Sequence, residues 1–91
     1  MNKLSLKIIT IDKIAFEGEA IAVTVPAKDG LITVYANHTP LISVLSSGVI
    51  SVKKENEEKT DFKISEGVLE VRQGSNVLVL TDKAEVLIKA S

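Results

Sequence analysis

The chain has 91 residues, with 11 basic and 12 acidic side chains, a formal net charge of −1 and only 3% aromatic residues. This balance argues against nucleic acid as a partner, because nucleic-acid binding needs a basic patch and rings on which bases can stack. The absence of cysteine excludes disulfides and thiolate chemistry. No apolar run reaches the ~18 residues of a membrane-spanning helix, and the length predicts one domain over residues 1–91.

Apolar and polar residues alternate along the first third of the chain, which predicts short β-strands. Alternation runs over residues 4–10, is interrupted by a glycine in "FEGE" (16–19), and resumes over residues 21–25 until Pro26. The "AKDG" stretch (27–30) then predicts a hairpin turn, because Asp-Gly between two apolar runs is a strong hairpin signal.

Turns continue to separate short runs of apolar residues along the rest of the chain. Apolar runs at residues 31–34 and 41–45 and a mixed stretch at 49–54 are followed by a charged connection and by further runs on both sides of Gly67, up to "VLVLTD" (77–82). No amphipathic helix of three turns is found among them. About nine or ten short strands with frequent turns are typical of an all-β sandwich or barrel.

The strands differ in how many of their faces are apolar. "ISVKKE" (50–55) and "TDFKIS" (60–65) carry charges on one face, whereas "LITV" (31–34), "LISVL" (41–45) and "VLVL" (77–80) are apolar on both. A strand of the second kind needs cover on both sides, and a sandwich core supplies only one. The surplus apolar face predicts a surface for a partner. The alternative is scattered apolar residues of an ordinary protein surface.

Residues that carry chemistry are few. His38 is the only histidine and would need further ligands to hold a metal. Ser43, Ser46, Ser47 and Asp29 are near it in sequence, but no nucleophile motif surrounds any serine. The chain also has no glycine-rich phosphate-binding motif. We therefore expect no catalytic residue, no metal site and no cofactor, and we interpret His38 as a turn residue.

Three stretches, in order along the chain, resemble the epsilon subunit of the bacterial F-type ATP synthase, which corresponds to the mitochondrial delta subunit. They are "LKIITIDKIAFEGEAIAVTVPAKDG" (6–30), "NHTPLIS" (37–43) and "ISEGVLEVRQGSNVLVLTD" (64–82). Departures from the family pattern are local. Asn37 and Glu66 stand where the family usually has glycine, and Leu31 stands where many members have glutamate.

The resemblance implies a flattened sandwich of two antiparallel sheets with about ten short strands. The family's C-terminal helical hairpin is not expected, because "KAEVLIKAS" (83–91) is too short for two helices. The implied function is that of a non-catalytic central-stalk subunit, which links the gamma subunit to the membrane c-ring and couples ion-driven rotation to ATP synthesis. Such a subunit is peripheral, at the cytoplasmic face of the bacterial membrane, and has no small-molecule substrate. The alternative is a β-sandwich adaptor of another complex.

The resemblance also implies two contact sites. By family position, the c-ring contact comprises Lys28, Asp29, Gly30 and Leu31. The gamma-subunit contact comprises Thr10, His38, Leu41, Ile42 and Ser43. Successive residues of a strand face opposite sides, so only one of Leu41 and Ile42 is expected to point outward, and the sequence does not say which.

Overall fold

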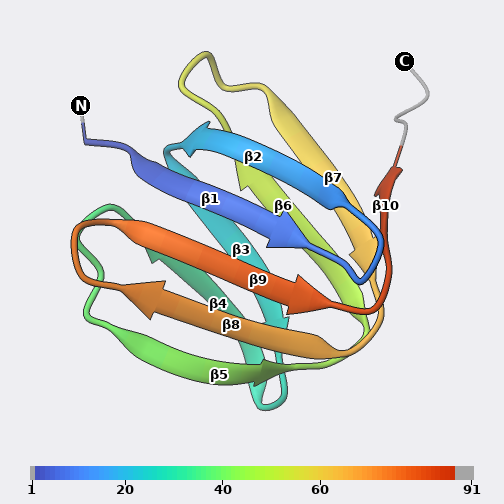
Figure 1. Ribbon diagram of the computed structural model, residues 1–91. Coiled ribbons are helices and arrows are strands. Elements are labelled where there is room, and N and C mark those ends of the chain that lie inside the picture. The colour runs from blue at the N-terminus through green and yellow to red at the C-terminus, as the bar shows by residue number, and fades with distance from the viewer. Residues whose placement is uncertain (1, 88–91) are drawn as a thin grey trace.

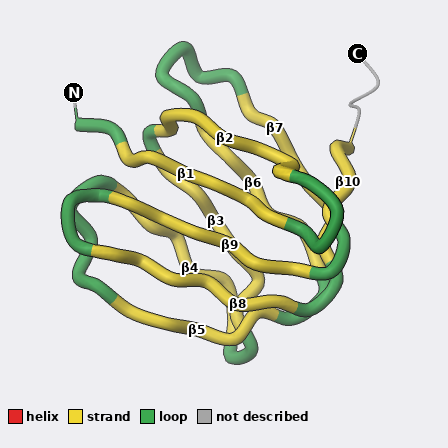
Figure 2. Tube along the Cα trace, in the orientation of Figure 1, coloured by secondary structure: helices red, strands yellow, loops and turns green. Residues whose placement is uncertain are grey.

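The computed structural model describes residues 2–87, in which ten β-strands are connected by short loops and no helix is present (Figures 1 and 2). No helix in this part of the chain could therefore cross a membrane. The strands are β1 (Leu4–Ile9), β2 (Ile14–Ala20), β3 (Ala22–Ala27), β4 (Gly30–Tyr35), β5 (Leu41–Leu45), β6 (Gly48–Lys53), β7 (Lys59–Ile64), β8 (Gly67–Arg72), β9 (Asn76–Thr81) and β10 (Ala84–Leu87).

The strands form one sheet path that doubles over into two layers (Figure 1). The path runs β10-β7-β6-β3-β5-β8-β9-β1-β2, and β4 pairs with the free side of β3. We call β4, β3, β6, β7 and β10 the first layer, and β5, β8, β9, β1 and β2 the second layer. The layers join where Ala27 of β3 pairs with Leu45 of β5. At this corner the Lys28 N–H donates to the Val44 carbonyl at 3.1 Å.

The expected all-β sandwich and its ten strands are confirmed, with one difference in pairing. β1 and β9 run parallel, from Ser5 opposite Asn76 to Ile9 opposite Leu80, whereas the other paired strands are antiparallel. Alternation along one strand says which residues share a face, but it carries no information about which strand lies beside it. The expectation about the C-terminal end, from residue 88 on, lies outside the described residues.

The core lies between the layers and is built from alternate residues of the strands, because every second side chain points inward. Its fully buried members come from both layers and include Val23, Val25, Val34, Ile50, Val52 and Phe62 from the first and Leu4, Leu6, Ile8, Leu69 and Val79 from the second. The outward positions Lys53 and Lys63 are exposed. This agrees with the solvated face that the sequence predicted for β6 and β7.

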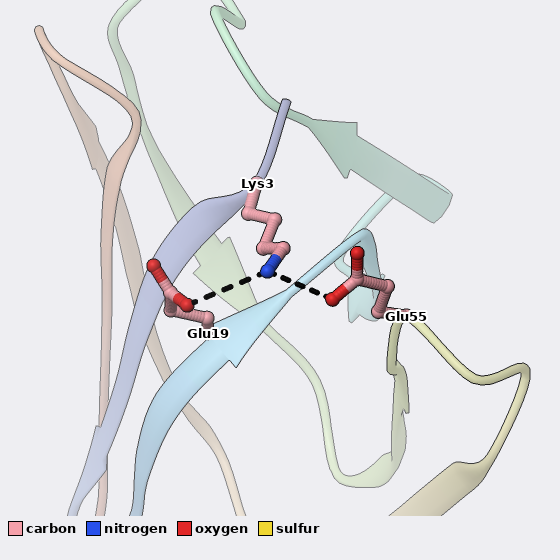
Figure 3. Close-up of polar contacts among 3 residues, drawn as sticks. All are labelled: Lys3, Glu19 and Glu55. Carbon is pink, nitrogen blue, oxygen red and sulfur yellow. Dashed lines mark ion pairs between the residues drawn. The ribbon is translucent and has the colours of Figure 1, made fainter. Parts of the chain in front are cut away.

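Side-chain contacts connect β2 and the residue before β1 to β7 and to the β6–β7 connection. Phe16 and Phe62 meet edge to face with ring centroids 5.8 Å apart. Lys3 lies between two carboxylates, with its Nζ 2.8 Å from Glu55 and 3.8 Å from Glu19 (Figure 3). The hydrogen bond and charge of Glu55 raise the pKa of Lys3 above its ordinary value, and Lys3 lowers the pKa of Glu55 in return.

Candidate functional site

Outward-facing apolar residues line up across four neighbouring strands of the second layer. Val44 of β5 is opposite Val68 of β8, Val68 is opposite Leu80 of β9, and Leu80 is opposite Ile9 of β1. Paired residues project from the same face of a sheet, so these four side chains form one row, which we call the apolar stripe. Val44, Val68 and Leu80 are exposed by 57%, 38% and 45%, and Ile9 is half-buried.

A groove of about 400 Å³ lies at the end of the strands, next to the apolar stripe. Ile9, Val68 and Leu80 line one part of it. The exposed Ile11 of the β1–β2 turn extends its apolar surface. The charged residues of its lining are Glu66 and Asp82, which come from the β7–β8 and β9–β10 turns. The groove is therefore apolar inside and acidic at its rim.

The neighbouring row on the same face is mixed in character. Ile42 is opposite Glu70, Glu70 is opposite Leu78, and Leu78 is opposite Lys7. Lys7 forms an ion pair with Glu17 of β2 at 3.4 Å. Away from the apolar stripe, the face thus becomes progressively more polar.

The structure decides the orientation of the "LISVL" strand. Leu41 is half-buried and packs against the core, whereas Ile42 points outward and is 73% exposed. Ser43 shares the inward parity of Leu41 and lies at the edge of the layer, where its hydroxyl is 3.4 Å from the Val44 carbonyl. Of the five predicted gamma-contact residues, Ile42 is therefore the one that offers a large apolar side chain to a partner.

Thr10 and His38 lie at opposite ends of the second layer. Thr10 directly follows β1, is buried, and exchanges hydrogen bonds with Lys13 in the β1–β2 turn. His38 precedes β5, and its Nδ1 donates to the Thr39 carbonyl at 2.7 Å. β5 is antiparallel to β8, β8 is antiparallel to β9, and β9 is parallel to β1, so β5 and β1 run in the same direction. The two predicted contacts thus flank the face at its two ends rather than forming one cluster.

The four predicted c-ring residues form the tip of the β3–β4 hairpin. Ala27 pairs with Gly30 across the turn, and Gly30 has φ of 134°, a conformation that favours glycine. Lys28, Asp29, Gly30 and Leu31 are all exposed. A groove of about 370 Å³ lies between this tip and β5, and Ile42 and Ser43 also line it. The structure therefore brings part of the predicted gamma contact beside the predicted c-ring contact.

The members of the apolar stripe were not among the residues that the sequence singled out for a partner. The signal for two of them was present, because "LISVL" and "VLVL" are apolar on both faces. The sequence does not contain a signal for the strand register, which places Val44, Val68, Leu80 and Ile9 in one row. Within residues 2–87, no group of three or more histidine, cysteine or acidic residues is arranged to hold a metal ion.

The fold and the face together define a small β-sandwich domain with a row of exposed apolar side chains on its outer face. Comparison with known proteins gives its family. The pattern of the family described as "ATP synthase, Delta/Epsilon chain, beta-sandwich domain" matches residues 3–86. The chain belongs to this family.

Similar proteins include ATP synthase epsilon chains of bacteria. The epsilon chain of Sulfurimonas denitrificans is 39% identical over 84 residues, which cover 92% of this chain and 64% of the relative. The epsilon chain of Brevibacillus brevis is 29% identical over 86 residues, which cover 94% of this chain and 64% of the relative. The chain thus spans less than two thirds of the length of these relatives.

Solved structures with the same fold come from mitochondrial ATP synthases. A chain in the Euglena gracilis ATP synthase structure, described as OSCP/F1/c-ring, superposes with a TM-score of 0.90 at 23% identity and covers 98% of this chain and 56% of that one. A chain in the Tetrahymena thermophila structure, described as central stalk/c-ring, superposes with a TM-score of 0.74 at 13% identity and covers 91% of this chain and 66% of that one. At such identities the likeness establishes the fold alone.

Proposed function

We propose that the chain is the β-sandwich of a non-catalytic central-stalk subunit of an F-type ATP synthase. In this role it binds the gamma subunit on one side and rests on the c-ring on another, so that ion-driven rotation of the ring is transmitted to gamma and drives ATP synthesis. The single observation that carries the proposal beyond family membership is the apolar stripe, which leaves large side chains on an open strand face. Exposed, contiguous apolar surface of this kind marks an interaction site.

The gamma subunit is assigned to the outer face of the second layer. Ile42 and the apolar stripe supply apolar contact, with Thr10 and His38 at the two ends of the face. Ser43 lies at its β5 edge. Leu41 does not contact gamma directly in this assignment; it packs on the core and holds β5 in place. Polar groups at the edge of an interface set register, and its buried centre supplies most of the affinity.

The c-ring is assigned to the tip of the β3–β4 hairpin, at Lys28, Asp29, Gly30 and Leu31. A hairpin tip that projects from a stiff sheet can touch the polar loops of a ring without ordering new backbone. Through these contacts the subunit is peripheral to the cytoplasmic face of the bacterial membrane. Exposed ion pairs made by Lys28 or Asp29 would each contribute only ~0–1 kcal/mol, so the hairpin orients the subunit more than it anchors it.

Cross-linking in the assembled enzyme tests both assignments. A cysteine at Asp29 is expected to cross-link to a cysteine placed in a cytoplasmic loop of the ring subunit, and a cysteine at Ile42 is expected to cross-link to gamma. Cysteine at Lys59, an exposed residue of β7 in the first layer, is the control and should cross-link to neither. Recovery of the chain in a different complex, without gamma or ring subunits, would refute the proposal in favour of an adaptor role.

A further inference from the structure

The outer face of the second layer has two halves, which differ in whether their charged side chains form ion pairs within the chain. Away from the apolar stripe, the charges pair within the chain, as Lys7 does with Glu17 at 3.4 Å and Arg72 with Glu70 at 3.0 Å. A partner that covers these groups has no unmatched charge to neutralise. This half of the face therefore gives little information about the charge of its partner.

The half that contains the apolar stripe is different. Glu66 and Asp82 line the groove beside Val68 and Leu80, and within residues 2–87 neither carboxylate forms an ion pair. Lysines are present in the adjoining turns, at positions 13 and 83, but they do not line the groove. The apolar surface thus has an acidic rim whose charge is not balanced by the groove itself.

The two acidic turns are held in a fixed position by one buried threonine. The Thr81 hydroxyl lies 3.0 Å from the Glu66 carbonyl oxygen, 3.1 Å from that of Ser65 and 3.3 Å from that of Lys83. Its single proton serves one of these acceptors at a time, and the Ser65 hydroxyl at 3.2 Å completes the cluster. The β7–β8 and β9–β10 turns are therefore tied together, so that little ordering is needed when a partner binds.

We infer that the partner segment that docks on the apolar stripe is apolar and carries at least one lysine or arginine that faces Glu66 and Asp82. The inference rests on the proposed function, in which the partner is the gamma subunit. Apolar side chains of that segment would cover Val68 and Leu80, and its basic group would meet the acidic rim. Complementary rim charges accelerate association and set orientation more than they raise affinity, so the rim would decide in which direction gamma lies across the strands.

The test measures association and dissociation rates of the full-length subunit with purified gamma at about 20 mM and about 1 M salt. The charge-reversal variant combines Glu66→Lys with Asp82→Lys. Its matched control is the Glu57→Lys and Glu58→Lys pair, which makes the same charge change in the exposed β6–β7 connection. We expect the rim reversal to slow association about tenfold at low salt and to have no effect at high salt, where the Debye length falls to ~3 Å. The control should leave the association rate unchanged.

A second pair of variants tests the apolar part. Val68→Asp on the apolar stripe is compared with Val49→Asp on the outer side of the first layer, since the two valines are 38% and 40% exposed. Val68→Asp should raise the dissociation constant at least 100-fold and Val49→Asp less than threefold, with both variants folded by circular dichroism. Equal association rates for the rim reversal and its control would overturn the inference while leaving the proposed function intact. Failure of the wild-type subunit to bind gamma would refute both.

Discussion

Gly67 begins β8 at a point where no side chain fits. It is opposite Leu45 on one side and Thr81 on the other, so both of its neighbours are paired strands. A Cβ at this position would press into the Leu80 carbonyl oxygen well inside van der Waals contact, and it would lie 3.1 Å from the Thr81 Cβ. The obstacle is mainly backbone, which cannot rotate away as the end of a flexible side chain can. Gly67→Ala must therefore move β8 away from β9.

The cost follows from two effects. Forcing an extra methyl group into a packed site costs ~1–3 kcal/mol, and loss of a neighbouring ladder hydrogen bond costs about 1 kcal/mol more. The reduced entropy of the unfolded chain returns only ~0.4–1 kcal/mol. We expect Gly67→Ala to lower the free energy of unfolding by about 2–3 kcal/mol, which is a large part of the ~5–14 kcal/mol typical of a domain of this size.

Gly18→Ala is the matched control, because Gly18 also lies within a strand. A Cβ there would meet the Phe16 ring at 3.5 Å, an ordinary contact distance, so the free energy of unfolding should change by less than about 1 kcal/mol. Urea unfolding followed by far-ultraviolet circular dichroism gives the midpoint and the slope, and a change of midpoint at constant slope reports stability. Equal midpoints for the two variants would show that β8 and β9 can separate freely, contrary to the packing argument.

Three further predictions use the same unfolding assay. Leu41→Asp should cost ~2–4 kcal/mol because it puts a carboxylate against the core, whereas Ile42→Asp should cost less than ~1 kcal/mol; similar costs would contradict the assigned orientation of β5. Asn37 has φ of 65°, and its side chain accepts a hydrogen bond from the Ser75 hydroxyl. Asn37→Ala should therefore lower the free energy of unfolding by ~1–2 kcal/mol, and Asn37→Gly should lower it clearly less. The reverse order would exclude backbone strain as the cause. Glu55→Gln should lower stability at neutral pH and not near pH 2. The lowered pKa of Glu55 gives stability that is present above its ordinary value of 4.5 and is lost as the pH falls through the lowered pKa. The raised pKa of Lys3 gives stability that is lost as the pH rises above 10.5. If the variant and the wild type lose the same stability between neutral pH and pH 2, the result would argue against this ion pair.

The sequence predicted what depends on short-range patterns. Alternation located the strands, Asp29-Gly30 marked a hairpin that forms as expected, and the tolerance of asparagine for positive φ agrees with the φ of 65° that Asn37 adopts. It could not predict what depends on pairing. The parallel alignment of β1 with β9 brings Ile9 beside Leu80 across about 70 residues of sequence, and no local signal encodes that contact. The apolar stripe therefore became visible only when the register was known.

The outer face of the first layer provides an internal comparison for the apolar stripe. There, the central row of paired residues is Thr33, Thr24, Ser51, Asp61 and Leu87, of which the first four are polar, and the two threonine hydroxyls are hydrogen-bonded at 2.9 Å. Both rows occupy outward positions on strands of the same sandwich, and both layers bury their inner faces in one core. The fold therefore accommodates hydroxyl groups at such central outward positions. Apolar side chains on the second layer add little to stability while exposed, and they raise the risk of aggregation. Under the proposed function, we expect a bound partner to cover these side chains and to gain from their burial.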